Sequence, residues 1–272
     1  MKRLLIILFA IVLLAGCRKD APVDAQELTT MTYSVKAPVQ FFTKAAGEGD
    51  KINILWCGVY HKNAEDIYVY MPDMSAFVVV TPGKDIKVPL TLIRNQYYKL
   101  VFVAQRRNND NTKAYTYTYN IDYTTGDMAL NAPVTDGEYL DVFVKVDTVG
   151  PIAGNENREI TLDRPVAQIN VGTSAAEAEL TTTFDLTLTG VPASYNLFTG
   201  TRSESTVEHT FQRLEPIGGP LSVAGTDYNH MTTLYIFGGN KIGGAITYGQ
   251  SAKTFSNIDT APNHKTNIVG NI

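Results

Sequence analysis

The sequence predicts an all-β protein built from two β-sandwich domains. Apolar and polar residues alternate with a period of two along many short segments, as they do in strands with one buried face. Clusters of Gly, Pro, Asn and Asp separate these segments, which is typical of sandwiches and barrels. Helical periodicity is nearly absent: residues 174–180 are the one plausible helical turn, with a loop as the alternative.

Residues 1–16 have the features of an export signal that ends in a lipobox. A basic start precedes an unbroken apolar run over residues 4–15, which is too short to span a bilayer as a stable helix. Residues 14–17 are Leu-Ala-Gly-Cys, the pattern cut by a lipoprotein signal peptidase after a lipid joins the cysteine. We therefore predict lipidation of Cys17 and a membrane anchor made of acyl chains. The alternative is an ordinary signal peptide with an incidental cysteine.

Charge and cysteine content exclude several function classes. The chain has 23 Lys and Arg against 27 Asp and Glu, and its net charge is −4. Its basic residues are dispersed, and the pair Arg106-Arg107 adjoins an Asn-rich segment that we expect to be a solvated hairpin tip. Because phosphate binding needs clustered cations, we expect no nucleic-acid partner. With Cys17 lipidated, Cys57 is the one thiol left, so stability must come from hydrophobic burial rather than an intrachain disulfide.

Strand patterns occur in both halves of the mature chain. Residues 31–35 alternate as a first strand, and residues 86–92, 142–146 and 184–189 have the same pattern. Residues 115–123 place four tyrosines and an isoleucine on one face, so we predict a single strand there.

A stretch rich in Gly, Pro, Asn and Asp, residues 147–159, is predicted to separate the two domains. No sequence repeat relates the halves. The expected organisation is a lipoprotein signal peptide (1–16), an N-terminal segment with the first strand and a possible processing site (17–50), an N-terminal β-sandwich (51–158) and a C-terminal β-sandwich (159–272).

No constellation of catalytic or metal-binding residues stands out. The four histidines are widely separated, and His61 lies before a segment that resembles a turn, which disfavours a metal site there. Cys57 lies in a strongly apolar segment, so we expect a buried, inert thiol. Residues 238–244 are glycine-rich, and we predict a hairpin there rather than a phosphate loop. We therefore expect no enzyme activity, no cofactor and no metal.

The 15 tyrosines leave glycan binding open. Tyrosine rings can stack on sugars, but they serve equally well in the core and cross-strand pairs of a β-sandwich. The sequence does not single out a glycan site.

Three segments resemble motifs of the fimbrillin-like surface lipoprotein family of Bacteroidetes. Residues 162–173 (LDRPVAQINVGT) are similar to the strand that opens the second domain of these proteins. Residues 191–200 (VPASYNLFTG) are similar to a turn, and residues 263–272 (NHKTNIVGNI) to the closing strand. With the lipobox, the resemblance covers nearly the whole chain. It implies two transthyretin-like β-sandwich domains in tandem after a lipoprotein signal peptide.

The resemblance also implies a function. It predicts a fimbrial (pilus) subunit or accessory component for cell adhesion, at the outer membrane and surface of a Gram-negative bacterium. The implied partners are other fimbrial subunits, joined by β-augmentation, and the outer membrane through the N-terminal lipid. The position as shaft, tip or anchor stays open. The alternative is a non-polymerising surface lipoprotein that binds a glycan or a host ligand.

In family members that polymerise, a protease removes the N-terminal segment with the first strand, and a neighbour's donor strand fills the groove. Here a cut between Lys44 and Ala45 would remove the predicted first strand. The family's best-known processing enzymes are arginine-specific, yet no arginine lies between Arg18 and Arg94. A lysine-specific or trypsin-like protease would accept Lys44, whereas a strictly arginine-specific one would not.

The C-terminal segment is a candidate donor strand. Thr266, Ile268, Gly270 and Ile272 share one face of a predicted strand that begins at His264. At ~3.3 Å per residue this strand is long enough to cross a sandwich. The alternative is an ordinary edge strand of its own domain.

Overall fold

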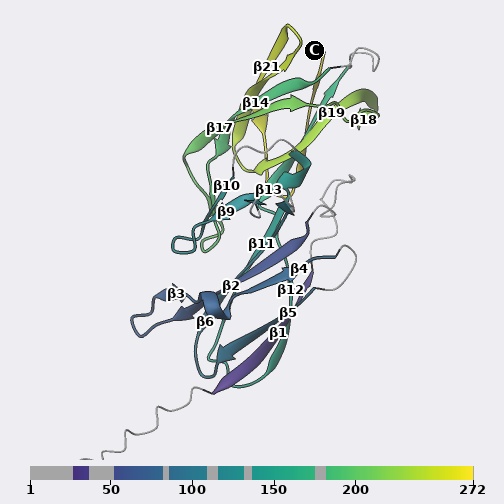
Figure 1. Cartoon of the computed structure of the whole chain (residues 1–272). Coiled ribbons are helices and arrows are strands. Elements are labelled where there is room, and N and C mark those ends of the chain that lie inside the picture. Colours follow the sequence, from purple (N-terminus) through teal and green to yellow (C-terminus); the bar gives the residue numbers. More distant parts are fainter. Residues whose placement is uncertain are drawn as a thin grey trace, which may run out of the picture.

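The computed structural model describes residues 27–36, 52–81, 86–108, 116–131, 137–174 and 182–271. Within these ranges every regular element is a β-strand apart from two short 3-10 helices, Pro72–Met74 and Gly137–Leu140, which confirms the predicted all-β class. The molecule is elongated, with β1 toward one end and the C-terminus at the other (Figure 1). The predicted signal peptide lies outside the described residues, as does most of the segment 174–180.

Two sheets face each other at the β1 end of the molecule. One has the order β12-β1-β5, and the other has the order β11-β6-β2, with β3 and β4 both paired to β2. The strands confirm the predictions for residues 31–35, 86–92 and 142–146. Their bounds are β1 Leu28–Lys36, β2 Ile54–Lys62, β3 Tyr68–Tyr70, β4 Ala76–Val79, β5 Ile86–Ile93, β6 Tyr98–Gln105, β11 Val142–Val149 and β12 Glu156–Thr161.

Strand β2 is buried on both of its faces. Leu55, Cys57 and Val59 belong to the core that lies between the two sheets. Trp56 and Tyr60 alternate with them and belong to a second core cluster on the opposite face. The β11-β6-β2 sheet therefore separates two hydrophobic cores, which explains why β2 has an almost unbroken apolar sequence.

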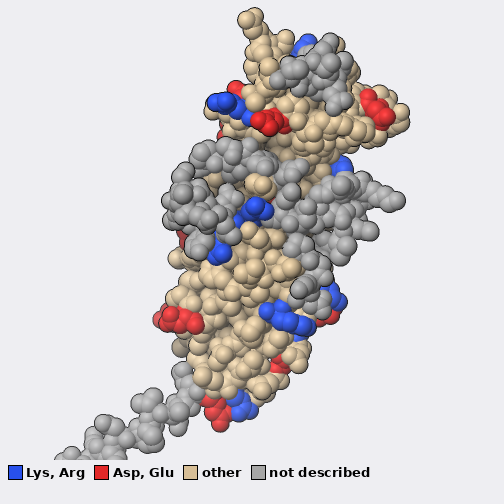
Figure 2. Space-filling model, turned by 45° about the vertical axis from the view of Figure 1, so that its right-hand side comes forward, with Lys and Arg blue, Asp and Glu red and all other residues tan. Residues whose placement is uncertain are grey.

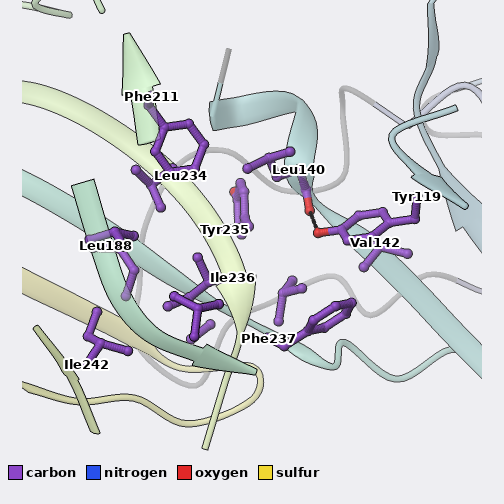
Figure 3. Close-up of a cluster of buried hydrophobic side chains, with 14 of the residues drawn as sticks. Tyr119, Leu140, Val142, Leu188, Phe211, Leu234, Tyr235, Ile236, Phe237 and Ile242 are labelled. Carbon is purple, nitrogen blue, oxygen red and sulfur yellow. Dashed lines mark hydrogen bonds between the residues drawn. The ribbon is translucent and has the colours of Figure 1, made fainter. Parts of the chain in front are cut away.

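Two further sheets form the C-terminal part of the molecule, with the orders β18-β19-β13-β22 and β17-β14-β20-β21. Leu188, Phe211, Leu234, Ile236 and Ile242 pack together in their core (Figure 3). The strands include the predicted segment 184–189. Their bounds are β13 Val166–Thr173, β14 Phe184–Pro192, β17 Thr206–Leu214, β18 Pro220–Val223, β19 Thr226–Phe237, β20 Lys241–Tyr248, β21 Ser251–Asp259 and β22 Lys265–Gly270.

A small sheet of order β16-β15-β10-β9 joins the two parts. Strands β9 (Tyr119–Ile121) and β10 (Asp127–Leu130) come from the first part, whereas β15 (Tyr195–Asn196) and β16 (Thr201–Arg202) come from the second. The second core cluster accordingly runs without a break from Trp56 to residues of β20 and β22. The division after residue 158 stays a prediction; it falls inside β12, which pairs along its whole length with β1.

Two local predictions are wrong. Residues 115–123 do not form one strand, because the chain changes partner at Thr118: β8 (Thr116–Tyr117) pairs with β7 (Arg107–Asn108), whereas β9 pairs with β10. Residues 238–244 do not close a hairpin, because β19 and β20 belong to different sheets. A Cβ at Gly238 would lie 2.6 Å from the carbonyl carbon of Ala261, so this glycine allows a close approach where the chain crosses between sheets.

Candidate functional site

Strand β1 is the central strand of its sheet. It pairs antiparallel with β5, where Met31 lies opposite Leu90, and parallel with β12, where Met31 lies opposite Glu156. Its backbone is therefore hydrogen-bonded on both sides. Because neighbouring strands are about 4.8 Å apart, removing β1 would leave two open strand edges about 9.6 Å apart.

Alternate side chains of β1 fill the first core. Thr29, Met31, Tyr33 and Val35 are at most 4% exposed, whereas Leu28 at the start of the strand is 61% exposed. Burial of each large apolar side chain is worth about 1.5–3 kcal/mol. One short segment near the N-terminus thus contributes a large share of the packing of this sandwich.

Tyr33 also makes a polar contact inside the sandwich. Its hydroxyl donates a hydrogen bond of 2.7 Å to Oδ2 of Asp147, and its ring centroid lies 4.9 Å from that of Phe102. Asp147 also accepts a hydrogen bond of 3.2 Å from Nη1 of Arg158. Burial, and then the Asp147 carboxylate, raise the pKa of Tyr33 above its usual range, so this side chain stays a neutral donor.

Polar contacts fix both ends of β1. The Asn155 side-chain oxygen accepts hydrogen bonds from the Thr29 hydroxyl (3.0 Å) and from the Thr30 backbone N–H (2.9 Å). At the other end, Lys36 forms a 2.7 Å ion pair with Glu159. This ion pair is exposed and contributes at most about 1 kcal/mol to stability. The polar contacts at the two ends of β1 therefore serve mainly to set the register of β1 against its neighbouring strands.

The predicted processing and lipidation residues, Cys17, Lys44 and Ala45, lie outside the described residues. Their positions in the sequence flank β1: Cys17 precedes it, and Lys44 and Ala45 fall in the connection between β1 and β2. A cut in this connection would separate β1 and Cys17 covalently from the rest of the chain, while β1 would still be held by its pairing with β5 and β12.

The structure places the C-terminal candidate strand in its own domain. β22 is the edge strand next to β13 and runs parallel to it, with Ile268 opposite Val171. Ile268 is 8% exposed, Thr266 is half-buried and Gly270 is exposed. Ile272 lies outside the described residues. β22 therefore occupies the edge position here, and its role as a donor to another molecule stays a prediction.

An aromatic cleft of about 310 Å³ lies on the face of β2 opposite to β1. Phe77 is 54% exposed and Tyr123 is 40% exposed, whereas Trp56 is 2% exposed. Phe77 stacks on Tyr117, with ring centroids 6.2 Å apart, and Tyr123 stacks on Tyr70 at 4.8 Å. The cleft is lined by Trp56, Phe77, Gln105, Tyr117, Tyr119, Asn120, Ile121 and Tyr123.

Polar atoms of this aromatic cleft are held in place. The Gln105 side-chain oxygen accepts a 2.8 Å hydrogen bond from the Tyr119 backbone N–H. The Tyr119 hydroxyl donates a 2.6 Å hydrogen bond to the carbonyl of Leu140 (Figure 3). The indole N–H of Trp56 is buried and has no hydrogen-bond partner among the described residues. A buried donor without a partner is costly, which singles out this atom.

The described part of the chain gives no sign of metal or thiol chemistry. It holds no group of three or more His, Cys, Asp or Glu side chains that could bind a metal ion. His61 shares a 3.0 Å hydrogen bond with Gln96. Cys57 is fully buried, as predicted, and burial raises the pKa of its thiol, so the reactive thiolate is disfavoured.

The charged side chains and the short helices of the described residues do not indicate a particular function. On the visible face, the acidic and basic side chains of the described residues are scattered rather than gathered by sign (Figure 2). No helix within the described ranges is long and apolar enough to cross a membrane.

A family model described as "Family of unknown function (DUF6562)" matches residues 23–272. This chain belongs to the DUF6562 family. A comparison with curated proteins finds no match for it.

Solved structures with a similar fold come from Bacteroidetes. A Bacteroides thetaiotaomicron protein described as a polysaccharide-binding candidate is 12% identical, with a TM-score of 0.54 over 89% of this DUF6562 chain and 90% of that one. The fimbrial anchor protein Mfa2 of Porphyromonas gingivalis is 14% identical, with a TM-score of 0.50 over 89% of this chain and 91% of its own. The expected resemblance to a fimbrial protein is thus confirmed at the level of the fold.

Sequence reasoning missed the aromatic cleft of this DUF6562 protein. Its signals were the abundance of tyrosine and the alternation that places Tyr117, Tyr119, Ile121 and Tyr123 on one face, and these four residues do line the cleft. Trp56, Phe77, Tyr117 and Tyr123 come from separate segments, so their meeting depends on how β2 pairs with β4 and on the break between β8 and β9.

Proposed function

We propose that this DUF6562 protein is a fimbrial subunit or accessory component, exported as an outer-membrane lipoprotein and assembled by β-strand exchange in cell adhesion. The observation that carries the proposal is the position of β1. It is a central strand of the first sandwich, yet it is joined to the rest of the fold through one connection, residues 37–53.

The slot that β1 fills is suited to a foreign strand. Strands β5 and β12 would each offer a row of backbone donors and acceptors, and the core would offer pockets where Thr29, Met31, Tyr33 and Val35 now lie. β-augmentation draws affinity from such edges and specificity from such alternate pockets. While β1 stays in place, both edges are covered, so the newly exported subunit is protected from premature pairing.

Lipidation at Cys17 and cleavage after Lys44 would act one after the other. Lipid at Cys17 would hold the exported chain at the outer membrane with β1 in its slot. A lysine-specific or trypsin-like cut between Lys44 and Ala45 would separate the lipid and β1 from the rest of the chain in one step. Without that cut, the lipid on Cys17 would keep the whole chain attached to the membrane, as in an anchor protein.

The C-terminal strand is a candidate donor, although it would fill the slot less completely than β1 does. Aligned in the direction of β1, Thr266 would replace Thr29, Ile268 would replace Met31 and Gly270 would fall at the pocket of Tyr33. A glycine there would leave the volume of a tyrosine side chain empty, which is costly in a close-packed core. Exchange through this strand would therefore require that β1 be removed first.

N-terminal sequencing of the cell-surface protein tests this proposal. For a shaft subunit we expect a form that begins at Ala45 and runs as a heat-sensitive ladder on gels. Lys44→Ala should abolish that form, whereas Lys51→Ala, a lysine change in the same connection, should leave processing intact. Cys17→Ala should prevent acylation. If only full-length acylated monomer is found, the shaft role is wrong and a lipid-held anchor or binder is favoured.

A further inference from the structure

We propose that the aromatic cleft beside β2 binds neutral carbohydrate. The sequence left glycan binding open without a site, and the fold supplies one. The cleft lies on the face of the β11-β6-β2 sheet that is turned away from β1. Carbohydrate binding there is therefore independent of strand exchange.

Flat apolar surfaces are already fixed at the mouth of the cleft. Phe77 on β4 is stacked against Tyr117, with ring planes 25° apart. Tyr123 is held against Tyr70 with ring planes 7° apart, and its centroid lies 5.1 Å from that of Trp56. Phe77 and Tyr123 are nevertheless both exposed to solvent. Such preordered, solvent-facing rings suit the apolar C–H face of a sugar ring, and ordering them costs little on binding.

The polar groups of the cleft suit sugar hydroxyls. Gln105 and Asn120 add amide groups to the lining, and an amide both donates and accepts hydrogen bonds, as a hydroxyl does. Apolar walls with a few placed polar groups are the usual make-up of a small-ligand site.

The lining also argues against other ligand classes. Among the described residues, the lining contains no Lys, Arg, Asp or Glu side chain, so these residues offer no charge to a phosphate, a nucleic acid or a charged peptide. A volume of about 310 Å³ lies at the low end of the range of small-ligand sites, about 300–1,000 Å³, and fits a short stretch of sugar units.

The test uses Trp56, the single tryptophan of the chain, as an internal reporter. The full chain, purified from cells in mild detergent, is titrated with soluble starch, xylan, mannan and dextran, and tryptophan fluorescence and retardation in native affinity gels are measured. We expect at least one of these polysaccharides to retard the protein and to change the fluorescence. Phe77→Ala and Tyr123→Ala should each weaken that binding by about tenfold or more, the loss expected when a central aromatic contact is removed.

Three variants serve as controls for this binding test. Tyr97→Ala removes a tyrosine that is 46% exposed outside the cleft and should bind as the unaltered chain does. Phe77→Leu keeps an apolar side chain without a flat ring and should lose binding as Phe77→Ala does. Lys44→Ala, which blocks the proposed processing, should bind normally, so failure of strand exchange is distinguishable from failure of the cleft.

Two outcomes would overturn the proposal. One is that none of the four polysaccharides binds. The other is that binding persists at full strength when Phe77 and Tyr123 are replaced in proteins whose unfolding midpoints match that of the unaltered chain.

Discussion

Replacing Tyr33 with alanine is expected to lower the free energy of unfolding by about 3–5 kcal/mol, the usual cost of deleting a large buried aromatic side chain. Tyr33 is 0% exposed and packs against Phe102. The change also removes its hydrogen bond to Asp147, which leaves that half-buried carboxylate with fewer donors. Urea unfolding of the full-length protein, followed by circular dichroism, measures the effect.

Two further variants help to interpret the loss in free energy of unfolding expected for Tyr33→Ala. Tyr33→Phe keeps the ring and loses the hydrogen bond, so we expect a cost of about 1 kcal/mol. Thr30→Ala changes an exposed side chain of the same strand and should cost about 0.5 kcal/mol or less. If Tyr33→Ala costs no more than Thr30→Ala, β1 does not fill the core of the folded protein, and the proposed slot does not exist.

Replacing Arg164 with alanine should cost about 3–5 kcal/mol, because it leaves the buried Asp141 carboxylate without its cation. The guanidinium donates from Nε and Nη2 to the two Asp141 oxygens at 2.9 and 2.8 Å, and the two side chains are 1% and 4% exposed. The guanidinium carbon also lies 4.3 Å from the ring centroid of Phe143. Since Arg164 lies two residues before β13 and Asp141 directly precedes β11, this pair ties the two parts of the molecule together.

A nearby exposed ion pair provides the control. Lys145 and Asp163 lie 2.9 Å apart, but their side chains are 37% and 71% exposed, so Lys145→Ala should cost at most about 1 kcal/mol. Replacing Arg164 and Asp141 together by Met and Leu should cost much less than Arg164→Ala, because no unpaired charge is left buried. If urea unfolding shows that Arg164→Ala and Lys145→Ala lower the free energy of unfolding equally, the Arg164–Asp141 pair does not tie the two parts of the molecule together.

Strands with one buried face could be predicted from the sequence. In β1 and β5 the pattern of buried and exposed residues depends on which face meets the core, and not on which strand lies alongside. The alternation of residues 31–35 and 86–92 was therefore sufficient to predict these two strands and their buried faces. Features set by distant partners could not be predicted this way: the change of partner at Thr118, the crossover at residues 238–244 and the small sheet that joins the two parts all depend on pairings between remote segments.

The candidate sites divide in the same way. The β1 slot could be predicted in outline, because a first strand and a lysine after it are local features of the sequence. Its central position between β5 and β12 could not, since β12 lies in a stretch that its Gly, Pro, Asn and Asp content marks as a linker. The aromatic cleft could not be predicted, because alternating tyrosines have the same pattern whether they face a core or a ligand.

Strand replacement in vitro tests the central claim most directly. The full-length protein, with a specific protease site placed at Lys44, is cut, unfolded in urea and separated from the released fragment that contains β1. It is then refolded with a labelled peptide of residues 27–36. We predict that the peptide binds at one copy per chain and restores cooperative unfolding, and that a peptide with Met31→Ser and Tyr33→Ser does neither. Without peptide, the cut chains should form heat-sensitive multimers. Refolding to a stable monomer without any peptide, or equal binding of both peptides, would contradict the claim that β1 fills an exchangeable slot.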